Sequence, residues 1–228
     1  MKPCAIVPLT HSDDFEAATV PVAGEAPLVR VVRSVLHAVS DDDVVVSTLP
    51  ALAAGTEGCL RAAGLGTAVV VAREPGSRHQ VIRAGLEHLE AQPDTSVFVL
   101  VCDHRYPLSP GEVAERVLAA LGGGGDVVVP AVAVTDSVKT VDELGSVLTT
   151  VDRSTLRTVQ YPRGFTASAL WQLVSVSSPS PSDGLDEFGA ALRAGLDVGV
   201  VEGDANARQV ELPRDAHLLD AVIACRRD

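Results

Sequence analysis

The chain has 228 residues, of which 46% are hydrophobic, and it carries a formal net charge of −12. This length and apolar content can bury one sizeable core, so we expect a single α/β domain over residues 1–228, although the length alone would permit two. The negative charge disfavours nucleic acid or an anionic membrane as the main partner, because both need a basic face. Such a chain can still bind a nucleotide through one locally basic pocket.

The cysteines are scattered along the chain without a C-x-x-C pair. This spacing favours small buried residues in a reducing compartment over a zinc site or a disulfide framework. The four positions are Cys4, Cys59, Cys102 and Cys225. In addition, no apolar run approaches the roughly 18 residues of a membrane span, and the N-terminus lacks the layout of a signal peptide. We therefore expect a cytoplasmic protein.

Short apolar runs alternate with amphipathic segments, which is typical of a mainly parallel sheet covered by helices on both faces. The predicted strands are Cys4–Leu9, Asp43–Leu49, Thr67–Ala72, Ser96–Cys102, Asp126–Val132 and Val198–Glu202. The predicted helices are Pro27–Val39, Ala51–Ala63, Ser77–Glu90, Pro110–Leu121, Thr166–Val174, Asp186–Ala194 and Arg214–Cys225. Ser109, directly before Pro110, has the pattern of an N-cap followed by proline at the first helical position. Ligands of such sheets lie beyond the carboxyl ends of the strands, so the segments after each strand are the places to look for a site.

The segment after the first strand is acidic. It contains Asp13, Asp14 and Glu16, and it has no glycine before Gly24. Unpaired carboxylates repel phosphate groups unless a metal ion intervenes. His11 in the same segment either donates to a phosphate or is a solvated surface residue.

The segments after the third and fourth strands carry the next candidates. Gly76 and Arg78 lie where the third strand leads into a helix, and Arg78 either lines a pocket or is an exposed first-turn residue. Asp103 follows the fourth strand, with Arg105 two residues later. A carboxylate in this place is suited to a hard cation such as Mg²⁺, which takes oxygen ligands and leaves room for phosphates. Alternatively, Asp103 caps the following turn.

The stretch after the fifth strand predicts a ligand loop and a β-arm. Thr135–Lys139 brings short hydroxyls, a carboxylate and an ammonium group together within five residues. A turn at Asp142–Gly145, followed by β-branched residues, predicts a two-stranded arm over about residues 137–153. Arg153 at its end either contacts a substrate or is a paired hairpin residue. Gln160–Phe165 is predicted to be a turn that leads into the next helix.

In their order and spacing these segments resemble the 2-C-methyl-D-erythritol 4-phosphate cytidylyltransferases of the non-mevalonate isoprenoid pathway. The family's D-T-[IV]-K corresponds to Asp136-Ser-Val-Lys139, its VLVHDAARP to Val99–Leu108, and its QTPQ-x-F to Gln160–Phe165. The resemblance covers essentially the whole chain and is strongest from about Ser77 to Phe165. It implies an open, doubly wound nucleotidyltransferase sheet with a protruding β-arm, and a homodimer in which each subunit lends its arm to the neighbour's pocket.

The resemblance also implies a reaction and the residues that perform it. A phosphate oxygen of a sugar-alcohol phosphate attacks the α-phosphate of CTP, and Asp103 holds Mg²⁺. The implied catalytic residues, which orient the acceptor, are Arg153, Lys139 and Arg208. The implied substrate-binding residues are Asp136, Ser137, Gln209, Gly76, Arg78 and Arg105. The pair Asp186 and Glu187 resembles the family's acidic pair, and it either contributes to metal binding or complements the dipole at a helix start.

The chain departs from the family pattern where catalysis is concentrated. The glycine-rich A-A-G-x-G-x-R loop and the lysine after it are missing, and Ala17 lies about where that lysine belongs. Tyr106 replaces an arginine, with Arg105 one residue earlier, and Val81 replaces the serine that contacts the base. Losing one hydrogen-bond donor to the charge that develops in the transition state lowers the catalytic rate about 10²–10³-fold. Two hypotheses follow: a cytidylyltransferase with weak or lost activity on CTP or another nucleotide, or a non-catalytic paralogue that keeps the fold and dimer and acts as a binding or partner protein.

Overall fold

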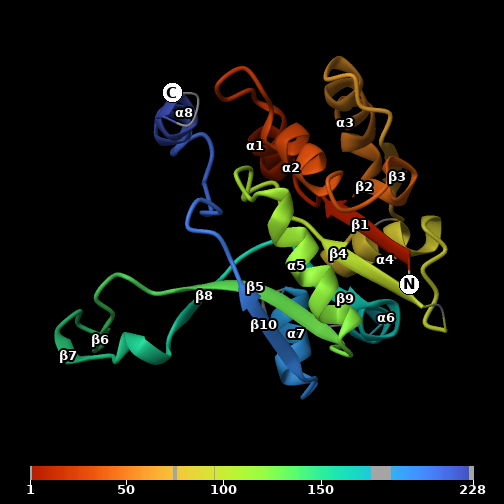
Figure 1. Ribbon diagram of the computed structural model, residues 1–228. Helices are drawn as coiled ribbons and strands as arrows, with labels where there is room; N and C mark the ends of the chain where they lie inside the picture. The colour runs from red at the N-terminus through yellow and green to blue at the C-terminus, as the bar shows by residue number, and fades with distance from the viewer. Residues whose placement is uncertain (1, 74–75, 95, 176–185, 226–228) are drawn as a thin grey trace.

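The computed structural model describes residues 2–73, 76–94, 96–175 and 186–225. They form a sheet with helices on both faces and an arm that extends to one side (Figure 1). The strands are β1 (Lys2–Pro8), β2 (Val44–Thr48), β3 (Ala68–Val71), β4 (Val97–Val101), β5 (Val127–Ala133), β6 (Lys139–Val141), β7 (Val147–Thr150), β8 (Arg157–Val159), β9 (Arg163–Thr166) and β10 (Val198–Glu202). The helices are α1 (Ser12–Thr19), α2 (Pro27–Val35), α3 (Pro50–Ala62), α4 (Arg78–His88), α5 (Gly111–Gly122), α6 (Ala167–Ser175), α7 (Glu187–Arg193) and α8 (Ala216–Cys225), with short 3-10 turns η1 (Asp41–Asp43) and η2 (Arg153–Thr155).

Among the described residues, the main sheet has eight strands in the order β10-β5-β9-β4-β1-β2-β3, with β8 paired to β5. β1 lies in the middle and is parallel to both neighbours, so that Ala5 is opposite Val44 on one side and Leu100 on the other. β8 and β9 are the antiparallel members, and β9 pairs with both β4 and β5. The predicted mainly parallel, doubly wound sheet is confirmed.

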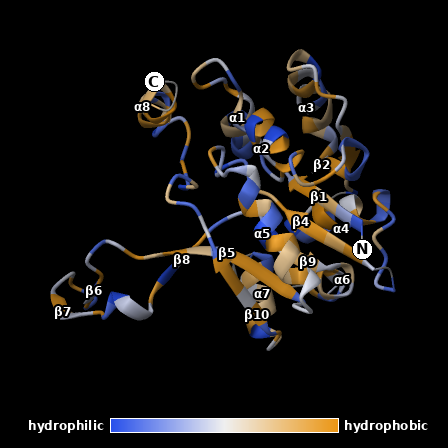
Figure 2. Cartoon of the chain, in the orientation of Figure 1, coloured by the Kyte–Doolittle hydropathy of each residue, from blue (hydrophilic) through white to orange (hydrophobic). Residues whose placement is uncertain are grey.

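The central strands are buried on both faces. Along β1, Ala5 and Val7 pack into a core shared with α1, α2, α3 and α5. Cys4 and Ile6 alternate with them and pack into the second core, with α4, α6 and α7. This two-sided burial explains why these strands are continuous apolar runs rather than alternating ones (Figure 2). A small third cluster, which includes Val22, joins α8 to the segment that follows α1.

All six strands and seven helices predicted from the sequence are present, with two main differences of detail. α2 ends at Val35, four residues earlier than predicted, because the chain tightens into 3-10-type bonds such as His37 N–H to the carbonyl of Ser34. Ser109 is not an N-cap: α5 begins at Gly111 with Pro110 as its cap residue. The Ser109 hydroxyl donates instead to the carbonyl of Tyr161, at 2.8 Å.

Three elements were not predicted: α1, β8 and β9. In α1, Asp13 and Asp14 lie in the first turn, where the helix dipole favours carboxylates. Phe15 of α1 packs so closely on α3 that a Cβ added at Gly55 would lie 2.5 Å from its ring. The prediction of a turn over Gln160–Phe165 was wrong in its second half, which forms β9. β9 is short, and its pairing partners β4 and β5 are distant in sequence, so local periodicity does not reveal it.

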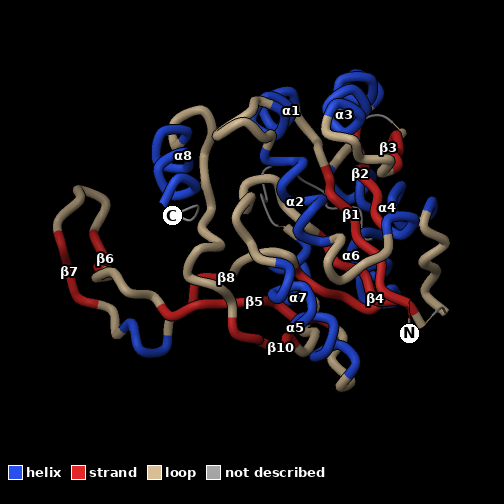
Figure 3. Tube along the Cα trace, turned by 45° about the horizontal axis from the view of Figure 1, so that its top comes forward, coloured by secondary structure: helices blue, strands red, loops and turns tan. Residues whose placement is uncertain are grey.

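The predicted arm is confirmed as a hairpin of β6 and β7, with Lys139 opposite Thr150. Its turn is closed by a bond from Gly145 N–H to the carbonyl of Asp142, at 3.0 Å, and Gly145 adopts a φ of +83°, which favours glycine. The arm extends away from the sheet and its helices (Figures 1 and 3). Its tip exposes an apolar side chain, Leu144, which is 92% exposed.

The four cysteines are free thiols. Cys4 and Cys102 are buried as predicted, and burial raises the pKa of each thiol to about 12. Cys59 is only partly buried and Cys225 is exposed, so the expectation of burial was wrong for these two. Within the described part of the chain, no helix is both long enough and apolar enough to span a bilayer.

Candidate functional site

The candidate site lies where the chain turns after β4. The carboxylate of Asp103 accepts the backbone N–H of Arg105 at 2.9 Å, and the carbonyl of Asp103 accepts the N–H of Tyr106 at 3.0 Å. Asp103 therefore caps the turn, which is the second of the two roles predicted for it from the sequence. The residue is only 3% exposed.

A guanidinium group covers the Asp103 carboxylate. Arg105 donates from Nε to Oδ1 at 3.0 Å and from Nη2 to Oδ2 at 2.6 Å. Burial acts to raise the pKa of Asp103, but the hydrogen bonds and charge of Arg105 outweigh burial and the pKa is lowered. The hydrogen bond to Asp103 raises the pKa of Arg105 in turn. Both groups are ionised at neutral pH, so this is a charged, bidentate pair.

Arg78 forms a second pair across the fold. α4 starts with a capping box between Ser77 and Gln80, which places Arg78 in its first turn. From there Nε donates to Glu187 Oε1 at 2.6 Å, and Glu187 is fully buried in the first turn of α7. Burial acts to lower the pKa of Arg78, but the charge of Glu187 outweighs it and the pKa is raised. Arg78 is therefore a bridge from α4 to α7, rather than a free first-turn residue.

A third pair joins β9 to the start of α7. Arg163 donates to Asp186, and Asp186 also caps α7 by accepting the N–H of Gly189 at 2.9 Å. Burial acts to raise the pKa of Asp186, and the charge of Arg163 outweighs it, so the pKa is lowered. The guanidinium of Arg163 lies 4.0 Å from the centroid of the Tyr161 ring, in cation–π contact.

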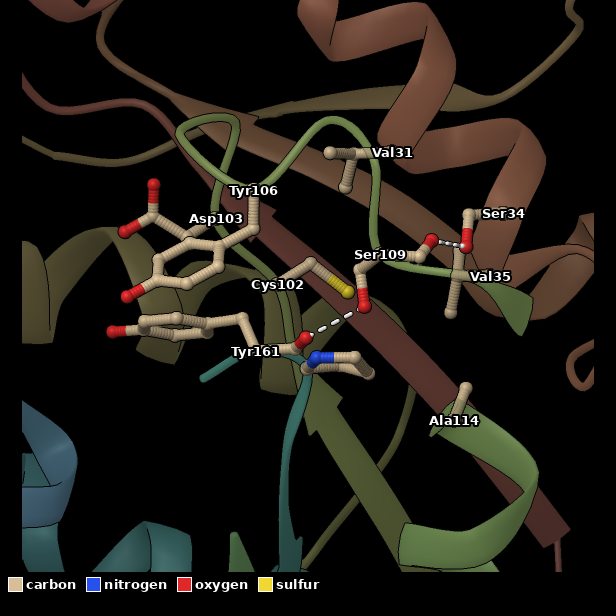
Figure 4. Close-up of a pocket in the computed structure, with 10 residues that line it drawn as sticks. Val31, Ser34, Val35, Cys102, Asp103, Tyr106, Ser109, Ala114 and Tyr161 are labelled. Atoms are coloured by element: carbon tan, nitrogen blue, oxygen red, sulfur yellow. Dashed lines mark hydrogen bonds between the residues drawn. The ribbon is translucent and has the colours of Figure 1, made fainter. Parts of the chain in front are cut away.

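Two tyrosine rings complete the wall of the site. The centroids of Tyr106 and Tyr161 are 5.1 Å apart, and their hydroxyl groups point to the same side as the Asp103 carboxylate (Figure 4). The Tyr106 hydroxyl lies 3.3 Å from Oε1 of Gln209, which connects the predicted Gln209 to the site. Behind the rings, a cavity of about 20 Å³ is lined by Cys102 and Ser109, among others, and is large enough for about one water molecule.

Several predicted residues lie on the arm instead. The ammonium of Lys139 donates to the Thr150 hydroxyl at 2.6 Å, across the hairpin. Arg153 donates to the carbonyl of Thr135, at the base of the arm. Asp136 and Ser137 are exposed in the loop before β6. Within one chain, the structure thus brings together Asp103, Arg105, Arg78 and Gln209, and it separates them from these four arm residues.

The remaining residues predicted from the sequence either have a role in the backbone or core, or lie exposed at the surface. Gly76 has a φ of +73°, and a Cβ there would lie 2.1 Å from Leu49, so only glycine fits. Arg208 is exposed, and its Nε donates to the carbonyl of Ala205 at 3.3 Å. Val81, which by resemblance corresponds to the family's base-contacting serine, is fully buried in α4.

Comparison with known proteins identifies the family. A sequence profile described as "IspD: 2-C-methyl-D-erythritol 4-phosphate cytidylyltransferase" matches residues 14–224. The chain belongs to this family. The 2-C-methyl-D-erythritol 4-phosphate cytidylyltransferase of Saccharopolyspora erythraea is 36% identical over 212 residues, covering 91% of this chain and 90% of that protein. The protein of the same name from Rhodococcus jostii is 35% identical over 208 residues, covering 90% and 86%.

Solved structures agree on the fold. A 4-diphosphocytidyl-2C-methyl-D-erythritol synthase from Anaerococcus prevotii superposes with a TM-score of 0.80 at 19% identity, covering 98% of this chain and 96% of that one. The 2-C-methyl-D-erythritol 4-phosphate cytidylyltransferase from Thermus thermophilus gives 0.74 at 24% identity, covering 98% and 100%. The nucleotidyltransferase-type sheet predicted from the sequence is thereby confirmed.

In this cytidylyltransferase-family chain, a helix replaces the expected phosphate loop. α1 begins directly after β1, and Thr10 donates from its hydroxyl to Asp14 at 2.9 Å. Asp13 and Asp14 lie in the first turn of this helix, so their carboxylates already complement the positive end of the helix dipole, which would otherwise favour a phosphate. Ala17, which by resemblance lies about where the family's lysine is expected, is also part of α1.

The acidic residues expected to hold Mg²⁺ are all engaged with arginine. Asp103 is covered by Arg105, Asp186 is bound by Arg163, and Glu187 is bound by Arg78. Across the described ranges, no group of three or more His, Cys, Asp or Glu side chains is arranged to hold a metal ion. The arrangement does not fit Mg²⁺ as it stands. Mg²⁺ at Asp103 remains a prediction that requires Arg105 to move.

Sequence reasoning missed His104, Tyr161 and Arg163 as parts of the site. His104 is buried beside Asp103, with 3.8 Å between Nδ1 and Oδ1, and burial lowers its pKa. The family's QTPQ turn has become Gln160-Tyr-Pro-Arg163, and this gain of a cation was the available signal. Its acidic partner, Asp186, corresponds to the family's acidic pair, so the new cation and this carboxylate could have been considered together.

Proposed function

We propose that this protein binds CTP and a sugar-alcohol phosphate beyond the carboxyl end of β4 and transfers the cytidylyl group slowly. In this reaction an acceptor phosphate oxygen forms a bond to the α-phosphorus of CTP. The bond from that phosphorus to the bridging oxygen breaks, so that pyrophosphate leaves and a CDP-alcohol forms. Family membership supports this reaction. The observation that supports a substrate site at the end of β4 is the pair of Arg105 and Asp103 there.

A low rate follows from the groups that the site lacks. Position 17 carries alanine instead of lysine, and α1 occupies the place of the glycine-rich loop. Each such donor to the developing charge is worth about 10²–10³ in rate, although losses within one catalytic unit are not additive. Arg78 and Arg163 are also held by acidic partners, which reduces the net positive charge that they offer to a triphosphate.

We also propose a cytoplasmic homodimer assembled through the arm. The β6–β7 arm, which begins at Lys139 and is followed by Arg153, extends away from the main sheet (Figures 1 and 3), so we propose that these two side chains reach a substrate in another subunit. Leu144, Val147 and Leu148 expose apolar side chains on the arm, which is unfavourable unless a partner covers them. Where β5, β8 and β10 meet at the arm base, an open hollow of about 460 Å³ offers a docking place.

The first experiment is isothermal titration with CTP, with ATP, GTP and UTP as controls, followed by pyrophosphate release with 2-C-methyl-D-erythritol 4-phosphate. We expect selective CTP binding and slow turnover. Replacing residues 10–17 by the family's glycine-rich loop with lysine at position 17 should raise turnover at least about 100-fold. The matched control carries the same loop with methionine at position 17, and we expect it to gain much less.

A second candidate is the non-catalytic paralogue. It is favoured by one observation, that the three arginines around the site are each satisfied by an acidic side chain. This candidate predicts that the grafted loop restores no turnover. If neither the natural nor the grafted chain binds any nucleotide, the proposed transferase function is wrong and the second candidate stands.

A further inference from the structure

Four donor contacts converge on the two oxygens of Asp103. Oδ1 accepts from the backbone N–H of Arg105 and from its Nε, at 2.9 and 3.0 Å. Oδ2 accepts from Nε at 3.2 Å and from Nη2 at 2.6 Å. An ionised carboxylate offers about four lone-pair sites, and three N–H groups of Arg105, one of them shared between both oxygens, occupy most of these sites.

A divalent ion at Asp103 would have to displace this guanidinium. Mg²⁺ binds at about 2.0–2.1 Å in near-octahedral geometry, usually through one or two carboxylates together with substrate phosphates. Asp186 and Glu187, the other two acids at the site, are bound by Arg163 and Arg78. An incoming ion would therefore have to break an existing charged pair, and it would be repelled by the arginine that it released.

Arg105 nevertheless faces outward. Its side chain is 43% exposed, whereas that of Asp103 is 2% exposed. The contacts with Asp103 come from Nε and Nη2, which leaves Nη1 on the other branch of the fork. A guanidinium held in this way remains charged, is fixed in direction, and can bind phosphate oxygens bidentately.

We propose that Arg105, fixed on Asp103, is the resident cation of this site and binds the phosphate groups of the ligand without a divalent metal ion. The inference rests on the proposed function to the extent that the ligand carries phosphate groups. It makes Asp103 a positioning residue for Arg105 rather than a metal ligand. The exposed side of the Arg105 guanidinium then supplies charge-assisted N–H donors to the phosphate groups, although Asp103 offsets part of its charge.

Metal binding can be tested without any nucleotide. Mn²⁺, a hard cation with the same preference for oxygen ligands, is titrated into the protein and the free ion is measured by electron paramagnetic resonance. We expect no Mn²⁺ site at Asp103 in the natural chain and a new one in Arg105→Gln, where the carboxylate is released. The double variant Asp103→Asn/Arg105→Gln should lose that new site. An Mn²⁺ site in the natural chain that Asp103→Asn abolishes would overturn the proposal.

Thermal unfolding gives a second readout for the same variants. Arg105→Gln leaves a buried carboxylate without its cation, so its Tm should fall and then rise by about 3–6 °C at tenfold excess of Mg²⁺ over its Kd. The natural chain should not respond to Mg²⁺. The control is Arg61→Gln, which removes an exposed arginine paired with Glu57 on α3 and should also show no response. If Arg105→Gln does not fold, the double variant Asp103→Asn/Arg105→Gln, which removes both charges, takes its place: it should bind no less Mn²⁺ than the natural chain, and it should bind pyrophosphate in EDTA more weakly.

Ligand binding is tested with pyrophosphate and CTP, each titrated in EDTA and in Mg²⁺. We expect each Kd to agree within about twofold between the two conditions, and Arg105→Gln to weaken pyrophosphate binding in EDTA at least about tenfold. If EDTA abolishes binding by the natural chain, the proposal is wrong while the proposed function stands. If pyrophosphate binds through Arg105 and no nucleotide binds, the proposed function is wrong and the inference stands. Binding of neither ligand, or binding that Arg105→Gln leaves unchanged, overturns the inference.

Discussion

The end of β4 and the β6–β7 arm use arginine in opposite ways. At the end of β4, Arg78, Arg105 and Arg163 are each held by an acidic side chain that is buried or partly buried. On the arm, the charged side chain of Arg153 is exposed and donates to a backbone carbonyl. A charge that is buried must be paired, because desolvation is costly, whereas an exposed charge is stabilised by water. The charges at the end of β4 are therefore paired within one chain, whereas the exposed side chains of the arm are available to contact another chain.

The largest expected effect comes from breaking a pair at the buried end. Replacing Arg78 by alanine leaves Glu187 buried without its partner, and we expect the free energy of unfolding to fall by about 3–5 kcal/mol in urea denaturation. The control Arg61→Ala, at an exposed pair on α3, should cost less than about 1 kcal/mol. Replacing both partners by apolar residues, Arg78→Met with Glu187→Leu, should recover most of the loss. A double variant as unstable as Arg78→Ala would show that the pair is not the cause.

A second, smaller effect is the acid dependence of the same region. Asp103 and Asp186 have pKa values that are lowered in the folded state. Their stabilisation is present above the unfolded pKa of about 3.9 and is lost as the pH falls through the folded pKa. We expect the free energy of unfolding to drop from pH 5 to pH 2 in the natural chain and to drop less in Asp186→Asn. Equal slopes for the two proteins would contradict the role of this carboxylate.

On the arm, we expect a change in assembly with little change in stability. Val147→Asp with Leu148→Asp places charges on the exposed apolar side chains of β7 and should convert a dimer to a monomer in light scattering. Because both side chains are exposed within one chain, the free energy of unfolding at low protein concentration should change by less than about 0.5 kcal/mol. Leu218→Asp, at an exposed apolar residue of α8, is the matched control and should leave the assembly unchanged. A natural chain that is monomeric at all concentrations would exclude the arm-mediated dimer.

The smallest effect on stability is expected for Arg153→Ala, whose consequence should appear in activity alone. If the arm serves the neighbouring pocket, mixing Arg153→Ala with the pocket variant Arg105→Gln should restore activity, because a mixed dimer contains one intact site. At equal amounts, random pairing in a two-fold dimer gives about a quarter of the natural activity. Mixing that restores nothing would show that the arm acts within its own chain, or not at all.

Much of the fold was available from the sequence, because local patterns encode it. The strands buried on both faces are continuous apolar runs, as β1 and β4 illustrate, and each predicted strand ends within two residues of the observed one. The turn at Asp142–Gly145 was predicted from its residue types. The elements that were missed lack such a signal: β9 is defined by two partners that are distant along the chain, and α1 was interpreted as a loop by its position after β1.

The sequence by itself determined the alternation of strands and helices, the arm, and the family, since these depend on local patterns and ordered motifs. It also placed Asp103, Arg105 and Arg78 at the ends of strands or the starts of helices. Only the tertiary structure decided how their charges pair. Arg78 and Glu187 are 109 residues apart, and Asp103 binds Arg105 because a tight turn directs both side chains to one point. Charge pairing depends on distance and burial in space, which residue order does not contain.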